Sequence, residues 1–276
     1  MPSNGITEVR DGLYRIVYYF LGAADVSMYL IAGEKSALLV DTGYVSTNVM
    51  QYVRQVTVLP LVVVNTHGHM DHIGGNNCFP EVFINRKDRA VARKHSDPTI
   101  LNGLMDHLTE VRPQLNSVPE LDTYRRELTT LSEHTVYYRD LPENGYFHLG
   151  NRDVEFLETP GHTLGSICLY DKKTGILLTG DTVCSKGVLL GFEESSDVKM
   201  YRETLYKLKS FCRSNNVKEL WSCHHENPLP PSMIDRYITL CDSILFGEKT
   251  GSFKDTGTCS GLYVEDGPIS MIYKEK

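Results

Sequence analysis

The strongest constraint on this chain is a cluster of histidine and aspartate side chains directly after a short apolar segment. The apolar segment is Leu61–Val64, and the cluster is the run His67-Gly68-His69-Met70-Asp71-His72. A continuous apolar run of this length is typical of a strand buried on both faces. Because side chains alternate along an extended chain, residues 67, 69 and 71 can project to the same side. The sequence therefore delivers three imidazoles and a carboxylate into one small volume.

These groups are the ligands that zinc and other borderline divalent ions prefer. Neutral imidazole binds zinc at about 2.0–2.1 Å, and carboxylate oxygens bind at a similar distance. Four such groups are more than one open catalytic site needs from a single segment, which indicates two ions. A solvated loop is a poor explanation, because three of the ten histidines fall within this run. We expect Gly68 to let the backbone pass close to a bound ion.

Three later segments each place a comparable side chain at the end of a predicted strand. They are the Pro/Gly turn 159–166 with His162, residue Asp181 after the apolar run 176–178, and the pair His224 and His225 after the run 219–222. Loops at strand ends commonly carry functional groups on a rigid scaffold. Alone, each of these residues is better explained as a turn residue. Together with the first cluster, they supply the ligands that it lacks.

The rest of the chain alternates predicted strands with predicted helices. Strands are indicated by β-branched and aromatic runs, and helices by apolar residues three and four positions apart. The predicted strands are 13–20, 26–31, 36–40, 61–64, 81–84, 154–158, 166–170, 176–178, 219–222 and 269–273. The predicted helices are 46–58 with Ser46 as N-cap, a stretch from Arg86, 197–212 and 232–246. This order predicts an α/β fold of two packed sheets with helices outside.

Residues 96–139 differ in character, because strand signals vanish and prolines punctuate a helix-like pattern. We predict a helical insertion there, within a single domain spanning 1–276, that covers the active site and sets specificity. Its apolar and aromatic residues suit an acyl or ring-bearing substrate. Burial of the insertion against its own scaffold or a dimer partner explains any one of them equally well. The residues concerned are Leu101, Leu104, Met105, His107, Leu108, Tyr124 and His134, with Met105, His107 and Tyr124 as the substrate-binding candidates.

Taken together, these motifs resemble those of the metallo-β-lactamase-fold superfamily, from about Leu13 to Phe246. The His-x-His-x-Asp-His motif is highly specific for that superfamily. The resemblance implies an αββα sandwich of two mixed β-sheets flanked by helices. It also implies two metal sites and their ligands: His67, His69 and His162 for one ion, Asp71, His72 and one of His224 and His225 for the other, and Asp181 as the bridge.

Two further positions follow from the same resemblance. The family usually ends the last of these strands in Pro-Gly-His-Gly, where this chain has Ser222-Cys223-His224-His225. Aligning the serine and cysteine with proline and glycine makes His224 the ligand, and leaves His225 a supporting or substrate-facing role. Asp41, in the run Asp41-Thr42-Gly43, resembles the family's buried structural aspartate. Cys223 is expected to be a core thiol rather than a nucleophile.

The resemblance implies a dinuclear hydrolase in which a metal-bridging hydroxide attacks the substrate. Asp71 is expected to orient the hydroxide and to help move a proton to the leaving group. The full ligand set is that of the hydroxyacylglutathione hydrolases and the acyl-homoserine lactonases, so we expect cleavage of a thioester, lactone or ester of a small molecule. Only Lys249 and Lys254 lie where glutathione-cleaving members carry a basic cluster, which argues against glutathione. Zinc is the expected metal, with iron or manganese as alternatives.

Two other activities stay open within the same family resemblance. One is a mononuclear non-haem iron dioxygenase of the persulfide dioxygenase type, which uses two histidines and an aspartate as ligands. The other is a phosphodiesterase. A non-catalytic binding module is a poor explanation, because every ligand position is filled.

Composition restricts partners and location. The net charge of −7 and the pI of about 5.8 argue against nucleic acid as a partner. No run approaches the roughly 20 apolar residues that span a bilayer, and residues 1–5 do not resemble a signal peptide. The seven scattered cysteines form no CxxC pair and are expected to be reduced thiols. We therefore expect a cytoplasmic protein without a membrane partner, and a homodimer is one alternative for its oligomeric state.

Overall fold

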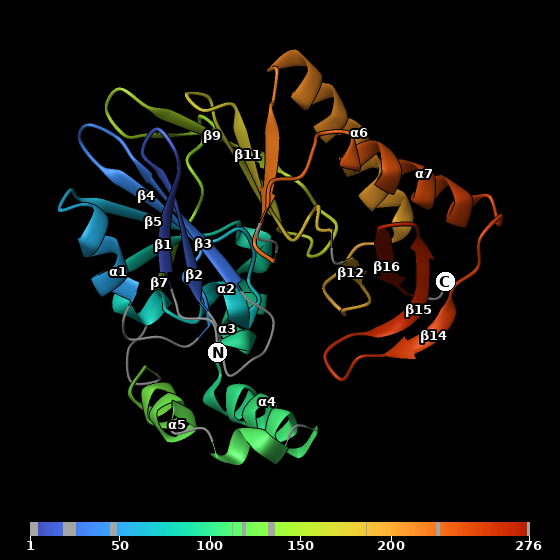
Figure 1. Ribbon diagram of the computed structural model, residues 1–276, viewed down its shortest axis with the longest axis horizontal. Coiled ribbons are helices and arrows are strands. Elements are labelled where there is room, and N and C mark those ends of the chain that lie inside the picture. The colour runs from blue at the N-terminus through green and yellow to red at the C-terminus, as the bar shows by residue number, and fades with distance from the viewer. Residues whose placement is uncertain are drawn as a thin grey trace. The chain divides into compact units, whose positions relative to one another are not determined.

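Three β-sheets with flanking helices make up the structure, a computed structural model (Figure 1). It describes residues 5–18, 26–44, 49–111, 113–117, 120–131, 136–185, 187–224 and 227–274. The chain forms two compact units. Unit 1 comprises Met1–Pro142 and His148–Arg152, and unit 2 comprises Glu143–Phe147 and Asp153–Lys276. Within the described residues, no helix combines the length and the apolar character needed to cross a bilayer.

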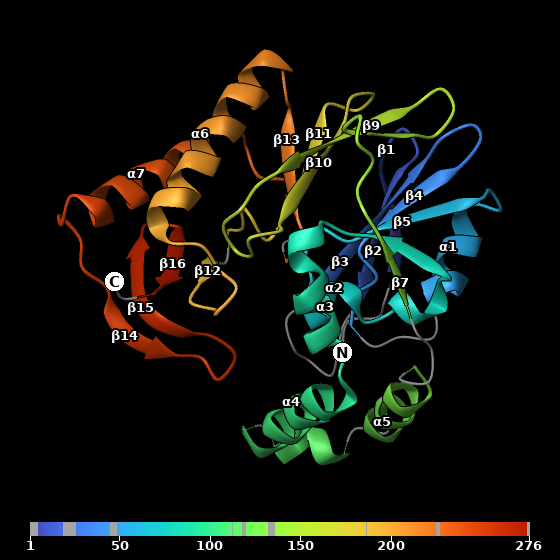
Figure 2. The same ribbon diagram turned by 180° about the vertical axis from the view of Figure 1, so that it is seen from behind.

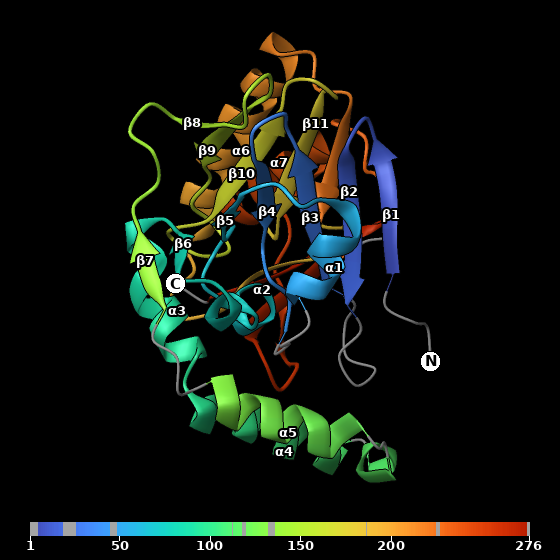
Figure 3. The ribbon, with the colours of Figure 1, turned by 90° about the vertical axis from the view of Figure 1, so that its left-hand side faces the viewer.

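Unit 1 contains a seven-stranded sheet whose strands follow one another in sequence order (Figure 3). They are β1 (Gly5–Arg10), β2 (Leu13–Tyr18), β3 (Val26–Ala32), β4 (Ala37–Val40), β5 (Leu61–Val64), β6 (Glu81–Phe83) and β7 (Tyr137–Arg139). Neighbours from β1 to β4 are antiparallel, and neighbours from β4 to β7 are parallel. Parallel strands end at the same edge of a sheet. Asp41 after β4 and the 67–72 run after β5 therefore leave the sheet at one edge.

Alternate residues of this sheet face a core that the helices of unit 1 complete. The helices are α1 (Val49–Val56), α2 (Met70–Ile73), α3 (Arg89–His95), α4 (Pro98–Val111) and α5 (Glu120–Leu131), with 3-10 turns η1 (Asn76–Cys78), η2 (Arg86–Asp88) and η3 (Pro113–Ser117). Met28 and Leu30 of β3 and Leu39 of β4 pack in one cluster with Val49 and Val53 of α1. This period of two is what a sheet with one face toward helices requires.

Helices α4 and α5 occupy much of the segment that the sequence predicts as a helical insertion. They lie side by side in Figures 1 and 2, and Arg125 on α5 donates to Asp106 on α4 at 2.6 Å. Leu101 and Met105 of α4 are buried in the core cluster of unit 1. The expectation that strands are absent up to residue 139 is wrong, because Tyr137–Arg139 forms β7 parallel to β6. Three residues are too short a run for alternation to be visible in sequence.

Unit 2 contains a five-stranded sheet in the order β13-β11-β10-β9-β8. The strands are β8 (Tyr146–His148), β9 (Asp153–Glu158), β10 (Ile167–Asp171), β11 (Ile176–Gly180) and β13 (Glu219–Ser222). Strands β9, β10 and β11 are antiparallel neighbours, whereas β11 and β13 are parallel with Gly180 opposite Ser222. The residues that follow β11 and β13 therefore emerge together at one edge.

A second sheet and two long helices complete unit 2 (Figure 2). The sheet has the order β12-β16-β15-β14, from β12 (Val188–Leu190), β16 (Ile269–Tyr273), β15 (Ser260–Asp266) and β14 (Ser252–Asp255). Helices α6 (Val198–Ser214) and α7 (Met233–Leu245) share one core with both sheets, in which Tyr201, Leu205 and Tyr237 are fully buried. The Asp197 side chain caps α6 by accepting from the Met200 amide at 2.7 Å.

The described residues confirm the predicted mixture of strands and helices. Every predicted strand has a counterpart within the described residues, while residues 19 and 20 and the proposed cap Ser46 lie outside them. The sheet formed by β12, β14, β15 and β16 is an addition, because only its strand at 269–273 is predicted. Strands β1, β7 and β8 are also additions to the predicted set.

Candidate metal centre

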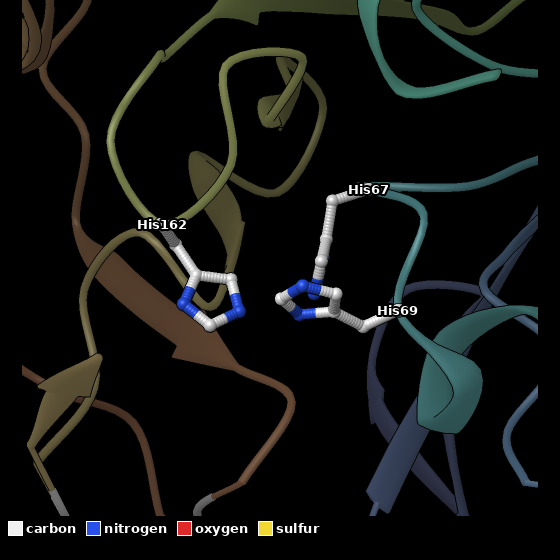
Figure 4. Close-up of side chains that lie close together, drawn as sticks. All are labelled: His67, His69 and His162. Atoms are coloured by element: carbon white, nitrogen blue, oxygen red, sulfur yellow. The ribbon is translucent and has the colours of Figure 1, made fainter. Parts of the chain in front are cut away.

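In unit 1, the histidines of the 67–72 run lie together at the end of β5. His67 and His69 are on the loop between β5 and α2, where Figure 4 shows their rings, and His72 lies within α2. The ring centroids of His67 and His69 are 4.8 Å apart, and those of His67 and His72 are 4.0 Å apart. All three side chains are buried, with at most 5% exposed. Three imidazoles therefore share one small and largely dehydrated volume, as predicted from the sequence.

Asp41 orients this cluster from the end of β4. It is fully buried and has the left-handed φ of 63°, an unusual conformation for a residue with a side chain. Its Oδ1 accepts from the Thr66 amide at 2.7 Å, and its Oδ2 accepts from the Thr66 hydroxyl at 2.8 Å. Its Oδ2 also lies 2.8 Å from His72 Nδ1. A carboxylate only accepts, so His72 carries its proton on Nδ1 and presents its lone pair on Nε2.

Thr66 orients the ring of His67 in a similar way. The threonine hydroxyl donates to Asp41, so its oxygen can accept the proton of His67 Nδ1 at 3.1 Å. This arrangement places the lone pair of His67 on Nε2 as well. A hydrogen bond to the second ring nitrogen is the usual way that proteins orient a histidine ligand and raise its basicity.

A buried polar network holds the backbone around His72. Its carbonyl oxygen accepts from the Thr42 amide at 2.9 Å and from the Asn65 amide side chain at 2.9 Å. The Thr42 hydroxyl donates to Asn76 Oδ1 at 2.8 Å, and Asn76 donates to Asn65 Oδ1 at 2.8 Å. These satisfied buried groups fix the segments after β4 and β5 relative to each other.

Gly68 has a steric role that the sequence alone does not predict. A Cβ at this position would lie 2.8 Å from the Ala92 backbone nitrogen and 2.9 Å from the Asp88 carbonyl oxygen. The Gly68 amide also donates to Asp88 Oδ2 at 2.9 Å. The glycine therefore admits the close approach of the η2–α3 segment.

In unit 2, one carboxylate oxygen lies between two imidazoles. Asp181 directly follows β11, His224 follows β13 and His162 lies on the turn between β9 and β10. The Oδ2 of Asp181 is 3.5 Å from Nε2 of His162 and 3.3 Å from Nε2 of His224. The structure thus brings together the three residues of this unit that the sequence singles out, apart from His225, which lies outside the described residues.

The His162 ring is oriented by a hydrogen bond at Nδ1, like the rings of His67 and His72. Its Nδ1 lies 2.8 Å from the Leu189 carbonyl oxygen, which can only accept, so the ring proton is on Nδ1. The side chain is 2% exposed, and the Phe192 ring meets it edge-on at 5.5 Å between centroids. Figure 4 shows the ring of His162 on its turn. Nε2 is therefore the nitrogen that faces Asp181.

The donor sets of both units fit divalent metal ions. His162 Nε2 faces Asp181 and His72 Nε2 faces Asp71, each with 3.5 Å between nitrogen and carboxylate oxygen. Both atoms of each pair are acceptors, so a proton or a metal ion must lie between them. In unit 1, the His67 ring lies 4.8 Å from the His69 ring and 4.0 Å from the His72 ring, so protonating these imidazoles together would bring like charges close to one another. This favours a metal ion over protons. Two ligands of one tetrahedral zinc ion, each about 2.0–2.1 Å from it, lie about 3.3–3.4 Å apart, close to these distances.

The candidates from the predicted insertion lie differently. Met105 is 1% exposed in the core of unit 1, so packing accounts for it and contact with a substrate is not supported. His107 is half-buried, and Tyr124 packs against the same core. His134 lies outside the described residues. Cys223 is 1% exposed, and none of the seven cysteines, each within the described residues, forms a disulfide.

Sequence reasoning did not identify two groups of residues beside the ligands. His95, at the end of α3, stacks on His69 with 4.9 Å between ring centroids. The segment 189–196 supplies the Leu189 carbonyl, Phe192 and Ser195, all in contact with His162. The run of polar residues after an apolar triplet at 188–190 is a weak signal, because it does not reveal which turn the segment packs against.

Comparison with known proteins settles the family. The family model described as the metallo-beta-lactamase superfamily matches residues 21–211, well over half of the 276 residues. The chain belongs to the metallo-beta-lactamase superfamily. Metallo-beta-lactamase from Pontibacter korlensis is similar in structure, with a TM-score of 0.61 and 16% sequence identity over 87% of this chain and 99% of that one. The predicted fold class is therefore confirmed.

Two curated relatives of this metallo-beta-lactamase superfamily member are hydrolases. The acyl-coenzyme A thioesterase MBLAC2 of Gallus gallus is 26% identical over 231 residues, which cover 80% of this chain and 78% of the relative. A hydroxyacylglutathione hydrolase of Chelativorans sp. (strain BNC1) is 26% identical over 162 residues, covering 58% of this chain and 48% of that protein. With the family and the ligand chemistry, these relatives establish a metal-dependent hydrolase, as predicted.

Proposed function

We propose that the chain is a dinuclear hydrolase that cleaves an acyl thioester of a small molecule. One ion would be bound by His67, His69 and His162, and the other by Asp71, His72 and His224, with Asp181 as the bridge. In this proposal residues 1–276 form a single metallo-β-lactamase-fold domain. Zinc is the proposed metal, since imidazole and carboxylate are its ordinary ligands.

The observation that carries the proposal is the common orientation of three histidines. His67, His72 and His162 each have a hydrogen-bond partner at Nδ1, within 3.1 Å. Nε2 of His72 faces Asp71, and Nε2 of His162 faces Asp181. Histidines that serve only packing have no need for the same tautomer. Asp181 supports the second ion, because its Oδ2 has one imidazole on either side.

Two bound divalent ions lower the pKa of a water molecule toward neutrality and polarise the acyl oxygen under attack. The remaining work falls to side chains of this chain. Asp71 is 18% exposed, so it combines a position beside His72 with access to a substrate. Its carboxylate would accept a proton as water attacks the acyl carbon. It would then deliver that proton to the leaving sulfur as the carbon–sulfur bond breaks.

A thioester is favoured over a lactone or an ester by the relatives. The MBLAC2 relative is named for acyl-coenzyme A and the Chelativorans relative for hydroxyacylglutathione, and both substrates are acyl thioesters. Glutathione itself is less well supported. Lys249 is engaged with Asp266 at 2.6 Å, and Lys254 lies over the Tyr263 ring at 3.9 Å. Neither lysine is therefore held ready for a glutathione carboxylate, and an acyl-coenzyme A is the first substrate to test.

We propose that the protein is located in the cytoplasm. Its seven cysteines form no disulfide, which fits a reducing compartment. The helical insertion at about 96–139, which includes α4 and α5, is proposed to cover the active site. Half-buried His107 and Tyr124, rather than Met105, are the substrate-contact candidates there.

A substrate panel on protein of known metal content tests the proposal. The panel contains acyl-coenzyme A and glutathione thioesters, lactones, simple esters, β-lactams and bis-p-nitrophenyl phosphate. We expect thioesters to have the highest kcat/KM, and we expect chelation to abolish the activity and zinc to restore it. Faster turnover of the phosphodiester would favour a phosphodiesterase. One iron per chain with oxygen uptake would favour a persulfide dioxygenase. Either result would overturn the proposed hydrolysis of thioesters.

A further inference from the structure

Strand β12 and the loop after it hold the turn that carries His162. The Leu189 carbonyl accepts from the imidazole Nδ1 at 2.8 Å, and the Ser195 hydroxyl donates to the His162 carbonyl oxygen at 2.6 Å. Two backbone bonds run beside them, from the Leu164 amide to Glu194 at 3.1 Å and from the Ser196 amide to Gly161 at 2.8 Å. His162 is therefore held at both its ring and its backbone by one short segment.

That segment is in turn held by a lysine directly after β16. The Lys274 ammonium group donates to the Ser195 carbonyl oxygen at 2.8 Å and to the Glu193 carbonyl oxygen at 3.0 Å. Strand β12 pairs parallel with β16, and Leu190 lies opposite Tyr273. The chain that follows β12 and the chain that follows β16 therefore leave the sheet side by side, where one ammonium group can bridge two carbonyl oxygens.

We propose that Ser195 and Lys274 are positioning residues for the metal ligand His162. The inference rests on the proposed function, which makes His162 a ligand. A histidine ligand binds well only when its ring is held in the direction of the ion, and such supporting bonds typically contribute 10–100-fold to metal affinity. Ser195 is 5% exposed and acts on the backbone of His162 directly, whereas Lys274 acts through Ser195. The sheet of β12 and β16 thereby supports the metal centre.

A purely structural role predicts something different. If these bonds only stabilise the loop, removing them would lower the temperature of unfolding and leave zinc binding by the folded protein unchanged. The chain offers a matched control for each residue. Ser196 is equally buried, at 4% exposed, but donates to Asp197 rather than to His162. Lys249 also donates to two oxygens, the Glu265 carbonyl oxygen and Asp266 Oδ1. Neither oxygen belongs to the segment that holds His162.

The test is zinc binding by metal-free protein in competition with a chromogenic chelator, with zinc alone as the probe. We expect Ser195→Ala to weaken one of the two zinc sites about tenfold and to leave the other within about twofold. Ser195→Thr, which keeps a hydroxyl, should recover most of the affinity. Lys274→Met should weaken the same site to a smaller degree, and Lys274→Arg should restore it. Ser196→Ala and Lys249→Met should bind zinc like the unaltered protein.

Three outcomes separate the inference from the function on which it rests. If His162→Ala binds two zinc ions with unchanged affinity, the ligand assignment itself is wrong, and the inference falls with it. If His162→Ala loses one ion but Ser195→Ala and Lys274→Met match their controls, only the inference is overturned. Should Ser195→Ala fail to fold, the comparison of Lys274→Met with Lys249→Met decides the question, because both substitutions keep an unbranched side chain, Lys274 is exposed and Lys249 is half-buried.

Discussion

At the scale of single residues, the orientation of each imidazole ring depends on the group that its Nδ1 contacts. His72 is oriented by Asp41, His67 by Thr66, and His162 by the Leu189 carbonyl. The sequence predicts the three histidines, because they stand in a dense motif or at a strand end. It implies a structural role for Asp41 through the family resemblance alone. It gives no indication of Leu189, since a backbone carbonyl has no residue preference.

Asp41→Asn should weaken zinc binding without removing any ligand. The amide has one acceptor oxygen where the carboxylate has two, so it cannot accept from the Thr66 amide, the Thr66 hydroxyl and His72 together. We expect zinc affinity to fall about 10–100-fold, measured by chelator competition. Asp171→Asn is the control, because Asp171 is also fully buried but accepts from Thr174, within unit 2. Equal zinc affinity in the two variants would contradict the role given to Asp41.

Removal of a ligand should abolish turnover and leave the fold intact. We expect His69→Ala and Asp181→Ala to lower kcat/KM for the best thioester by at least about a thousandfold. Each substitution removes a proposed direct ligand of a metal ion that would stabilise the oxyanion. Far-ultraviolet circular dichroism should be unchanged. His148→Ala, an exposed histidine of β8, serves as the control. Activity within a few-fold of the unaltered protein in either ligand variant would overturn the site assignment.

At the scale of elements, strand ends determine where the candidate ligands lie. The strand at 61–64 is predicted with its observed bounds, because four apolar residues flanked by turn signals leave little choice. Strands β14 and β7 could not be predicted in the same way. All four residues of β14 are exposed, and β7 has three residues. Such edge strands form because a neighbouring strand offers hydrogen bonds, which is a property of the assembled sheet and not of the local sequence.

The contact between the 67–72 loop and α3 predicts a steric effect at Gly68. A methyl group there would lie within 3 Å of the Ala92 nitrogen and the Asp88 oxygen, so the loop or the helix must move. We expect Gly68→Ala to lower the free energy of unfolding by about 1–3 kcal/mol and to weaken zinc binding. Gly103 in α4 is the control, since a Cβ there meets nothing within 4 Å.

Gly103→Ala should be neutral or should stabilise the protein by up to about 1 kcal/mol, because alanine favours a helix over glycine. Urea unfolding of the metal-free proteins measures both variants on the same scale. If Gly68→Ala were as stable as Gly103→Ala and bound zinc equally well, the close approach of α3 would have no part in fixing the ligand loop.

At the scale of the whole molecule, the proposed ligands follow four different strands of the sequence. Asp41 reaches His72 across 31 positions of sequence, and His162 reaches Leu189 across 27. The sequence could predict which histidines and aspartates gather at the strand ends within each unit, because these residues stand in local motifs that follow apolar runs. It could not predict the contacts that orient the ligands, because these arise only when the sheets are formed.

Buried thiols give unit 2 a specific response to alkaline pH. Burial raises the pKa of Cys168 from 9.0 to about 11, and it raises the pKa of both Cys212 and Cys241 to about 12. Below pH 9 these thiols are protonated in both states, and their contribution to stability is fully present. Between about pH 9 and 11, the unfolded chain loses protons that the folded chain keeps, so the free energy of unfolding must fall.

For Cys168 alone, this loss should be on the order of 1–2 kcal/mol by about pH 10.5. Urea unfolding at pH 8 and pH 10.5 measures it, with Cys168→Ala as the comparison. The variant is expected to be less stable at pH 8, because the substitution leaves a cavity, but it should lose less stability between the two pH values. An equal loss in both proteins would show that Cys168 does not titrate in this range.

The most direct test of the central claim is the number of metal ions bound per chain. Protein loaded with zinc and freed of excess metal should carry two ions per chain by native mass spectrometry. Asp181→Ala should carry one ion or none, because it removes the proposed bridge, and its thioester hydrolysis should disappear with the lost ion. A single ion per chain in the unaltered protein, or two ions retained in Asp181→Ala, would contradict the dinuclear site.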